Sequence, residues 1–375
     1  MGNKDKIKPR VIAFYLPQYH PTSDNDKWWG KGFTEWTNVG KAKPLFRGHY
    51  QPKVPAELGY YDLRLPEVRA AQAELAKEAG IEGFCYYHYW FGDGKQELEM
   101  PFNEVVRTGE PDFPFCLCWA NESWHAKFWD KDGKASSKKL LIEQRYLGHE
   151  DNVKHFYSLL PAFKDKRYIK VDGKLLFMIY RPLEFENVSE FIQDWQGLAR
   201  ENGLEGFHFV GQLNGALLND LEQNSLKPIF SLGFDAVNTV RLSNAFASAR
   251  SFSLKLKQRI NILFRGMPRI GEYKDLYPYF LGENDKRDDF YPTIIPNWDH
   301  TPRSGKNGSV LAGSTPDLFR EHVHEMLNAV VTKKTPIIFL KSWNEWGEGN
   351  YMEPDLKWGQ QYIEVLRDEI NLTIE

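Results

Sequence analysis

Eight short apolar runs, separated by longer stretches with helical spacing, restrict the fold of this chain more than any other feature. They cover residues 11–18, 81–90, 115–122, 175–180, 207–213, 234–240, 293–298 and 337–340. Apolar runs of this length indicate buried strands, and strands that alternate with helices form parallel sheets. The pattern predicts an α/β fold, a single (β/α)8 TIM barrel with long βα loops. We expect residues 1–375 to form one domain with its core between about residues 10 and 370.

The stretches between the runs carry the spacing and end signals of helices. Residues 66–79, 152–163 and 189–202 follow a helical pattern, and glycines Gly80 and Gly203 follow the first and the third. A glycine just past the last turn is typical of a helix C-terminus. A doubly wound open sheet would instead require a glycine-rich phosphate turn after the first strand. That position holds Pro17-Gln-Tyr-His-Pro21, which favours the barrel.

The composition fits a large core and excludes several classes of function. Apolar residues make up 42% of the chain, and the formal net charge of -3 gives no general attraction to nucleic acid. Cys85, Cys116 and Cys118 lie inside apolar runs and lack the spacing of disulfide or zinc ligands. We therefore expect neither metal nor other cofactor, and no stretch is apolar and long enough to span a bilayer. The expected location is cytoplasmic, or periplasmic if a signal peptide had been removed.

Polar and aromatic side chains follow the predicted strands at their C-terminal ends, where the active sites of barrels lie. The chain has 12 tryptophans, and many stand beside Asn, Asp, Glu or His near these ends. Aromatic rings cover the C–H faces of sugars and polar groups bind hydroxyls, so the mixture predicts a glycan-binding cleft. The residues expected to bind substrate are Tyr15, His20, Glu35, Trp36, His88, Tyr89, Trp90, Trp119, Asn121, Glu122, Asn297, Trp298, Trp343, Asn344, Trp346 and Glu353.

The last predicted strand ends in Trp343-Asn-Glu-Trp-Gly-Glu-Gly349, the best candidate for catalysis. Glycosidic bond cleavage or transfer uses one carboxylic acid to protonate the leaving oxygen and a second carboxylate as nucleophile or base. Glu345 and Glu348 provide such a pair if the residues between them form a turn, and the flanking indoles would raise the pKa of one carboxyl group. The alternative is a pair of surface glutamates at the start of the last helix. Glu122, which follows Asn121, is a rival catalytic candidate.

The connection between the sixth and seventh strands, residues 241–290, is too long for a plain loop between a strand and a helix. Within it, residues 250–270 carry six basic and no acidic side chains, interleaved with apolar ones. Such a segment fits an outer barrel helix with a solvated basic face, or weak peripheral contact with an anionic membrane.

Motifs across nearly the whole chain, from about residue 10 to 360, resemble those of the WbsX-like family. They are Tyr15-Leu-Pro-Gln-Tyr-His-Pro21, Asn25-Asp-Lys-Trp-Trp-Gly-Lys-Gly-Phe-Thr-Glu-Trp-Thr-Asn-Val39, Gly59-Tyr-Tyr-Asp-Leu-Arg64, Tyr87-His-Tyr-Trp-Phe91, Trp119-Ala-Asn-Glu122, Asn297-Trp-Asp-His-Thr-Pro-Arg303 and Trp343-Asn-Glu-Trp-Gly-Glu-Gly349. Members are described as glycosyltransferases of bacterial surface-polysaccharide loci and are related to glycoside hydrolase family 99 endo-α-mannosidases. This chain has Trp124-His-Ala where members often carry Trp-Thr-Arg, a departure that concerns substrate identity more than fold.

The resemblance implies a (β/α)8 barrel that attacks an α-mannoside-like bond with retention and without a metal. Glu345 would act as a base on the sugar's own 2-hydroxyl, which attacks the anomeric carbon to give an epoxide-like intermediate. Glu348 would be the general acid and then the base. We therefore expect a retaining glycoside hydrolase or transglycosylase acting on a bacterial surface polysaccharide. A glycosyltransferase of O-antigen or capsule synthesis is the alternative, and a non-catalytic glycan-binding barrel is a further one.

Overall fold

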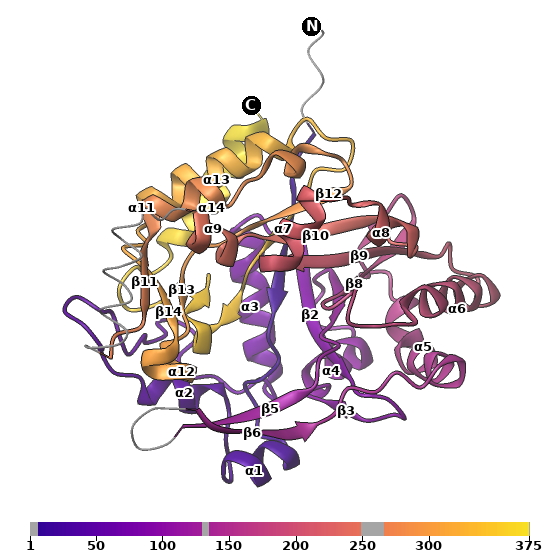
Figure 1. Cartoon of the computed structure of the whole chain (residues 1–375), viewed down its shortest axis with the longest axis horizontal. Helices are drawn as coiled ribbons and strands as arrows, with labels where there is room; N and C mark the ends of the chain where they lie inside the picture. The colour runs from indigo at the N-terminus through magenta and orange to yellow at the C-terminus, as the bar shows by residue number, and fades with distance from the viewer. Residues whose placement is uncertain (1–6, 130–134, 249–265, 375) are drawn as a thin grey trace, which may run out of the picture.

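A closed ring of eight parallel strands forms the centre of the molecule in this computed structural model, which describes residues 7–129, 135–248 and 266–374 (Figure 1). The strands are β1 (Arg10–Tyr15), β2 (Gly83–Trp90), β4 (Phe115–Trp119), β8 (Lys174–Ile179), β9 (Phe207–Asn214), β10 (Ala236–Val240), β12 (Phe290–Ile294) and β15 (Ile337–Leu340). Strand β1 pairs in parallel with both β2 and β15, and this pairing closes the ring. The predicted (β/α)8 barrel is therefore confirmed.

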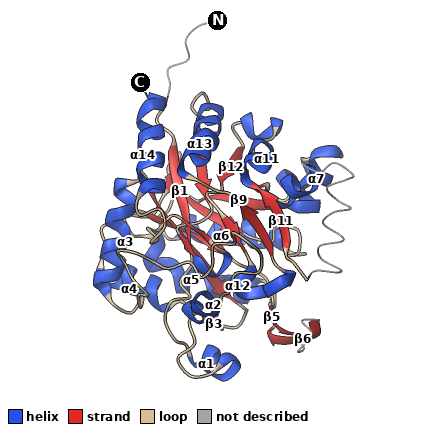
Figure 2. Ribbon diagram, turned by 90° about the vertical axis from the view of Figure 1, so that its left-hand side faces the viewer, coloured by secondary structure: helices blue, strands red, loops and turns tan. Residues whose placement is uncertain are grey.

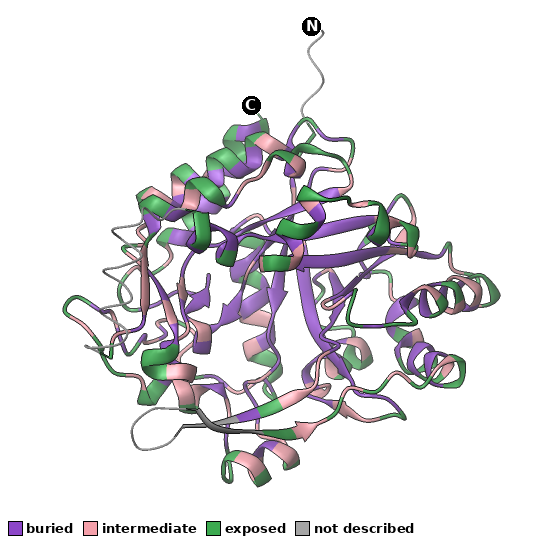
Figure 3. Ribbon diagram, in the orientation of Figure 1, coloured by how far each residue is buried: buried purple, intermediate pink, exposed green. Residues whose placement is uncertain are grey.

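The barrel strands are buried on both faces, as their unbroken apolar runs predict. Every residue of β2, β4, β10, β12 and β15 is buried (Figure 3). Inward side chains fill the ring and outward ones pack under the helices, so no strand needs a polar face. The seventh predicted strand is displaced, because β12 ends at Ile294 and residues 295–298 lie beyond the barrel ladder.

Helices cover the outside of the ring (Figure 2). They are α3 (Pro66–Glu78), α4 (Met100–Thr108), α5 (His149–Phe163), α6 (Val188–Glu201), α7 (Gly215–Gln223), α8 (Lys227–Ser231), α13 (Pro316–Val330) and α14 (Gln361–Ile374). Helix α13 shows how the sequence sets such an element. The Thr315 hydroxyl accepts a hydrogen bond from the Leu318 N–H at its start, Pro316 follows, and Phe319 and Val323 face the core.

The long connection between β10 and β12 forms a second layer beside the barrel. It contains α9 (Leu242–Ser248), β11 (Arg269–Glu272), α11 (Tyr273–Leu276), η1 (Tyr277–Tyr279) and η2 (Glu283–Lys286). Strand β11 pairs with β14 (Ser309–Ala312), which pairs with β13 (Trp298–Asp299), and a separate apolar cluster lies beneath this small sheet. Most of the basic stretch 250–270, and with it the predicted membrane contact, lies outside the described residues. Within the described ranges, no helix is both long and apolar enough to cross a bilayer.

The remaining elements lie in the long loops, most of them around the C-terminal ends of the strands. They are α1 (Ser23–Trp29), α2 (Glu35–Lys41), β3 (Gln96–Glu97), the hairpin of β5 (Trp124–Trp129) and β6 (Ala135–Ile142), β7 (Lys170–Val171), α12 (Thr301–Ser304), η3 (Gly305–Asn307), β16 (Asn344–Glu345), η4 (Trp346–Glu348) and β17 (Asn350–Tyr351). The predicted long βα loops are thus present, and those at the C-terminal ends surround the site described next.

Candidate functional site

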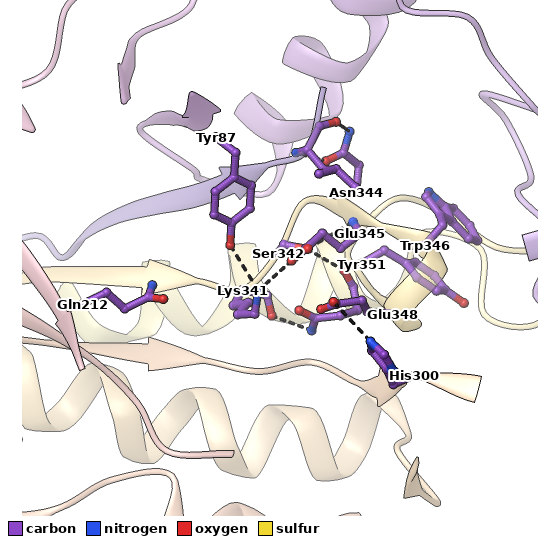
Figure 4. A network of polar contacts seen from close by, with 12 residues as sticks. Tyr87, Gln212, His300, Lys341, Ser342, Asn344, Glu345, Trp346, Glu348 and Tyr351 are labelled. Atoms are coloured by element: carbon purple, nitrogen blue, oxygen red, sulfur yellow. Dashed lines mark hydrogen bonds and ion pairs between the residues drawn. The ribbon is translucent and has the colours of Figure 1, made fainter. Parts of the chain in front are cut away.

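The closing motif folds back on itself directly after β15 (Figure 4). Strand β16 pairs antiparallel with β17, and the short helix η4 connects them. The Asn344 side chain accepts a hydrogen bond from the Leu16 N–H (2.7 Å) and donates one to the Leu16 carbonyl (3.0 Å). The Ser342 hydroxyl accepts from the Glu345 N–H (3.1 Å) and donates to the Asn350 carbonyl (2.6 Å). These bonds fix the backbone that carries the two glutamates.

Two glycines permit this turn for different reasons. Gly349 has a φ of +52°, in the left-handed region that favours glycine. Gly347 does not lie in that region, but a Cβ there would overlap the Glu35 carboxylate. The sequence predicts backbone freedom at both positions, and at Gly347 the requirement is instead space for a carboxylate from α2.

The motif opens into a cavity of about 680 Å³ at the C-terminal end of the barrel, here called the mouth cavity. Its aromatic lining comes from distant loops and strands: Trp29, Phe33, Tyr87, Tyr89, Trp124, Tyr180 and Trp298. Its ionisable lining is mixed in sign: Glu35, Lys41, Glu122, His125, His300, Arg303, Lys341, Glu345 and Glu348. Ring faces beside many hydrogen-bonding groups suit a sugar, which presents both C–H patches and hydroxyls.

Glu345 lies next to a buried lysine that follows β15. Lys341 Nζ donates to Glu345 Oε2 (2.7 Å) and to the Tyr87 hydroxyl (3.1 Å). Burial raises the pKa of Glu345, the charge of Glu348 raises it further, and Lys341 opposes both effects. Burial alone would lower the pKa of Lys341, but the charges of Glu345 and Glu348 raise it above its ordinary value. A carboxylate with a raised pKa is a better proton acceptor near neutral pH.

Glu348 occupies a different electrostatic environment, because Arg303 of α12 bridges it to Glu35. The guanidinium donates to Glu348 Oε1 (2.6 Å) and to Glu35 Oε1 (2.9 Å), and His300 Nε2 lies 3.7 Å from Glu348 Oε1. Burial would raise the pKa of Glu35, but the positive charge and hydrogen bond of Arg303 bring it below the ordinary value. The two glutamates of the motif therefore have separate cationic partners, Lys341 and Arg303.

The predicted site residues divide between the cavity and the structure behind it. Glu35, Tyr89, Glu122, Trp298, Glu345 and Glu348 line the mouth cavity. Tyr15, His20, Trp36, His88, Trp90, Trp119, Asn121, Asn297, Trp343, Asn344, Trp346 and Glu353 are absent from its lining. Of these, Asn297 and Glu353 line a second, smaller cavity beside it.

Strand β2 explains part of this division. Tyr87 and Tyr89 line the cavity, whereas the residues that alternate with them point to the helix layer. There His88 Nε2 lies 2.8 Å from the His155 Nε2, and the Trp90 indole donates to Asp151 (3.1 Å).

A buried polar group beneath the motif is centred on Glu353. Its carboxylate accepts hydrogen bonds from the Trp346 indole (2.6 Å), Gln72 (2.6 Å) and the Tyr61 hydroxyl (2.9 Å). Burial raises the pKa of Glu353 to about 7. Other predicted residues are also hydrogen-bonded within the protein. Tyr15 and Trp36 bind Gln72 and the Tyr61 carbonyl of this group. Elsewhere, Trp119 binds the Trp90 carbonyl, Asn121 binds Tyr146 and Arg181, and Asn297 binds the Tyr351 backbone.

Sequence reasoning missed the cations of the site. Lys341 is the first residue after the apolar run of β15, and Arg303 ends a motif that resembles the WbsX-like family. The sequence therefore contained a signal for both residues. Tyr87 and Tyr180 were missed although Tyr87 begins a motif already noted and Tyr180 directly follows β8. Across residues 7–129, 135–248 and 266–374, no three His, Cys, Asp or Glu side chains gather in a group suited to hold a metal ion.

The barrel, with paired glutamates and aromatic rings at its mouth, matches the architecture of carbohydrate-active (β/α)8 enzymes. Within that class it belongs to the family described as Glycosyltransferase WbsX, whose profile it matches over residues 11–366. The protein WxcX, described as uncharacterized, from two strains of Xanthomonas campestris pv. campestris (B100 and ATCC 33913), is 34% identical over 378 residues. That alignment covers 98% of this chain and 50% of WxcX. The chain thus spans about half the length of the curated relatives it matches.

Two solved structures show the same fold at low sequence identity. A glycoside hydrolase-like protein aligns with a TM-score of 0.61 and 15% identity, covering 99% of this chain and 96% of its own. The GH99 endo-α-mannosidase from Bacteroides thetaiotaomicron aligns with a TM-score of 0.53 and 15% identity, covering 97% of each chain. At this identity the likeness concerns the fold alone.

Proposed function

We propose that this protein cleaves or transfers a glycosidic bond of a bacterial surface polysaccharide with retention, using Glu345 and Glu348. One observation carries the proposal: two carboxylates of one turn face an aromatic cavity and have different cationic partners. Such a pair can divide acid and base roles. The family resemblance described above, to WbsX-like proteins of surface-polysaccharide loci and their endo-α-mannosidase relatives, supports a surface polysaccharide and an α-mannoside-like linkage.

In this proposal Glu345 is the base. Its raised pKa favours uptake of a proton from the substrate's 2-hydroxyl, whose oxygen then attacks the anomeric carbon. The Lys341 ammonium beside it orients the carboxylate and balances its charge. Tyr87, which accepts from Lys341, keeps the ammonium directed at the base.

Glu348 is the proposed acid, and Arg303 must release it before it can reach the leaving oxygen. In the present arrangement the guanidinium donates a hydrogen bond to Glu348 Oε1 at 2.6 Å. Arg303 has a second partner in Glu35, so it can keep one bond when substrate displaces it from Glu348. His300, at 3.7 Å, is near enough to exchange a proton through a small movement. Glu348 gives its proton to the leaving oxygen and then accepts the proton of the incoming hydroxyl. The incoming oxygen attacks the anomeric carbon and opens the epoxide-like ring, and Glu345 returns its proton to the 2-oxygen.

Transfer to a sugar acceptor is the second candidate, and the family description favours it. The same carboxylates could serve both outcomes, since a sugar hydroxyl can replace water in the second step. A donor carrying a nucleotide is a distinct case, because nucleotide recognition would then contribute to binding. Calorimetric titration with nucleotide-sugars, with and without Mn²⁺, separates that case from a polysaccharide-cleaving enzyme.

Replacement of either glutamate by glutamine tests the proposal. Products from the organism's own surface polysaccharide are followed by mass spectrometry for the wild type, Glu345→Gln, Glu348→Gln and Glu122→Gln. Loss of a positioned acid or base should reduce turnover by about 10²–10⁴-fold while the fold is retained. Glu364→Gln, on the exposed face of α14, serves as the control and should be fully active. Retained turnover in both site variants, or its loss only in Glu122→Gln, would refute the assignment.

A further inference from the structure

A second cavity, of about 190 Å³, adjoins the mouth cavity and shares Trp298 with it. We call it the side cavity. The loop of residues 46–53, the β13 and β14 strands and residues 351–362 form its walls, which include the rings of Tyr50, Tyr351 and Trp358. None of its charged side chains has a role in the reaction proposed above.

Lys53 is the unusual residue of the side cavity. Its side chain is only 8% exposed, yet its Nζ has one long hydrogen bond, to the Gly349 carbonyl at 3.4 Å. The ammonium also lies 5.2 Å from the centre of the Tyr351 ring. An ammonium group has three donors, and a buried cation needs them occupied to offset its lost hydration. Lys53 therefore has donors left for a ligand.

The nearby carboxylates do not fill this need, because other donors already occupy them. Asp299 and Asp355 both line the side cavity, and both carboxylate oxygens of each accept hydrogen bonds within the protein. The donors are Gln51 and Thr301 for Asp299, and Tyr351 with the N–H groups of Lys357 and Trp358 for Asp355. His49 Nε2 also lies 2.7 Å from Asp299. The charges of both aspartates act on Lys53 from a distance, but in the described part of the chain neither carboxylate forms an ion pair with its ammonium. The free donors of Lys53 are therefore open to an anion.

The rest of the lining indicates that the anion is part of a sugar. Trp298 and Trp358 supply aromatic rings to the lining. The Ser314 hydroxyl already donates to the Pro296 carbonyl, and the Thr315 hydroxyl accepts from the Leu318 N–H but keeps its own proton for a ligand. Lys357 adds a second, exposed cation at the rim, with its Nζ 4.9 Å from the Tyr50 ring centre and 4.8 Å from that of Trp358. A volume of about 190 Å³ is suited to one pyranose unit rather than to a chain.

We propose that the side cavity binds a carboxylate-bearing sugar unit, with Lys53 on the carboxylate and the tryptophan rings against the pyranose. This proposal rests on the proposed function in one respect: the sugar unit is taken to belong to the polysaccharide that binds in the mouth cavity and extends past Trp298. The substrate would then be an acidic polysaccharide. Binding of a monosaccharide tests it without any need for turnover.

Calorimetric titration of the full chain with D-glucuronate and with D-glucose is the experiment. The Glu345→Gln variant, which lacks the proposed catalytic base, is titrated in the same way. Its sugar binding shows whether the side cavity works independently of the proposed catalysis. A charge-assisted hydrogen bond should make glucuronate bind about tenfold more tightly than glucose. Lys53→Met should remove this preference, and Lys357→Ala, which changes an exposed side chain, should reduce it several-fold. Lys333→Met, at a buried lysine bound to the Phe290 carbonyl, should leave it unchanged.

Several outcomes would overturn the proposal. Equal affinity for the two sugars, or a preference that survives in folded Lys53→Met and in Lys357→Ala, would show that Lys53 is structural only. Loss of the preference in Lys41→Ala, which lines the mouth cavity, would assign the anion to that cavity instead. Inorganic phosphate that binds more tightly than glucuronate with the same dependence on Lys53 would mark a free-anion site and refute the sugar.

Discussion

Glu353 shows how one buried carboxyl group under the site can link stability to pH. Burial raises its pKa from an ordinary value of 4.5 to about 7, although three donors favour its ionised form. The folded protein then binds this proton more tightly than the unfolded chain does. The resulting stability is complete below about pH 4.5 and is lost as the pH rises to 7, where the carboxylate must ionise inside the protein.

Glu353→Gln removes this titration and tests it. Urea unfolding of both proteins at about pH 5 and pH 8 gives the difference in unfolding free energy at each pH. From about pH 5 to pH 8, the unfolding free energy of the variant should rise relative to that of the wild type by up to about 3 kcal/mol. One pKa unit corresponds to about 1.4 kcal/mol. The new amide donor adds an offset that does not depend on pH. Parallel pH profiles for the two proteins would contradict the raised pKa.

At the scale of elements, Arg303 joins three short segments that are remote in sequence. It stands on α12 and binds Glu35 of α2 and Glu348 of η4. The Glu35 side chain is 2% exposed, so the guanidinium is what compensates its buried charge. The packing of α2, α12 and η4 at the mouth therefore depends on one ion-pair network.

Arg303→Met should destabilise the fold by about 3–5 kcal/mol, the usual cost of leaving a buried charge without its partner. The pKa of Glu35 should rise in this variant, so its stability should fall with rising pH more steeply than that of the wild type. The measurement is urea unfolding, and Arg303→Met/Glu35→Gln should recover part of the loss. Arg64→Met, which breaks an exposed pair with Asp62, should cost less than about 1 kcal/mol. Equal costs for the two arginine variants would exclude the proposed network.

Strand β2 shows which part of the site could not be predicted from the sequence. The apolar run predicts strand β2, but the shared strand end also predicts that His88, Tyr89 and Trp90 all bind substrate, and only Tyr89 lines the mouth cavity. Alternation sends neighbouring side chains to opposite faces, and for a strand buried on both sides the sequence carries no sign of which face is inside. Only the closed ring decides that Tyr87 and Tyr89 reach the cavity.

At the scale of the whole molecule, the fold was predictable and the assembly of the mouth was not. Eight apolar runs with helices between them allow few arrangements, so the barrel follows from local patterns. The mouth instead combines Glu35, Arg303 and Glu348, and no local pattern indicates that residues 268 positions apart form an ion pair. The same is true of the side cavity, where Lys53 meets the Gly349 carbonyl across 296 positions.

The closed ring also predicts that the molecule unfolds as one unit. Strand β1 lies between β2 and β15, and α14, after the last strand, packs on both α13 and α3. The first and last quarters of the chain therefore support each other, and the barrel ring, as the described residues form it, has no open edge at which to separate.

Urea unfolding followed by far-UV circular dichroism and by tryptophan fluorescence tests this cooperativity. The 12 tryptophans lie between residues 28 and 358, so the fluorescence reports on most of the ring. The two transitions should coincide. Leu366→Ala, at a fully buried position of α14, should shift both together by about 2–5 kcal/mol. Leu372→Ala, at a position 54% exposed on the same helix, should shift them by less than about 0.5 kcal/mol. If the two transitions separated in Leu366→Ala, the C-terminal segment would unfold as an independent unit. The pairing of β1 with β15 would then not be enough to make the barrel and its site unfold together.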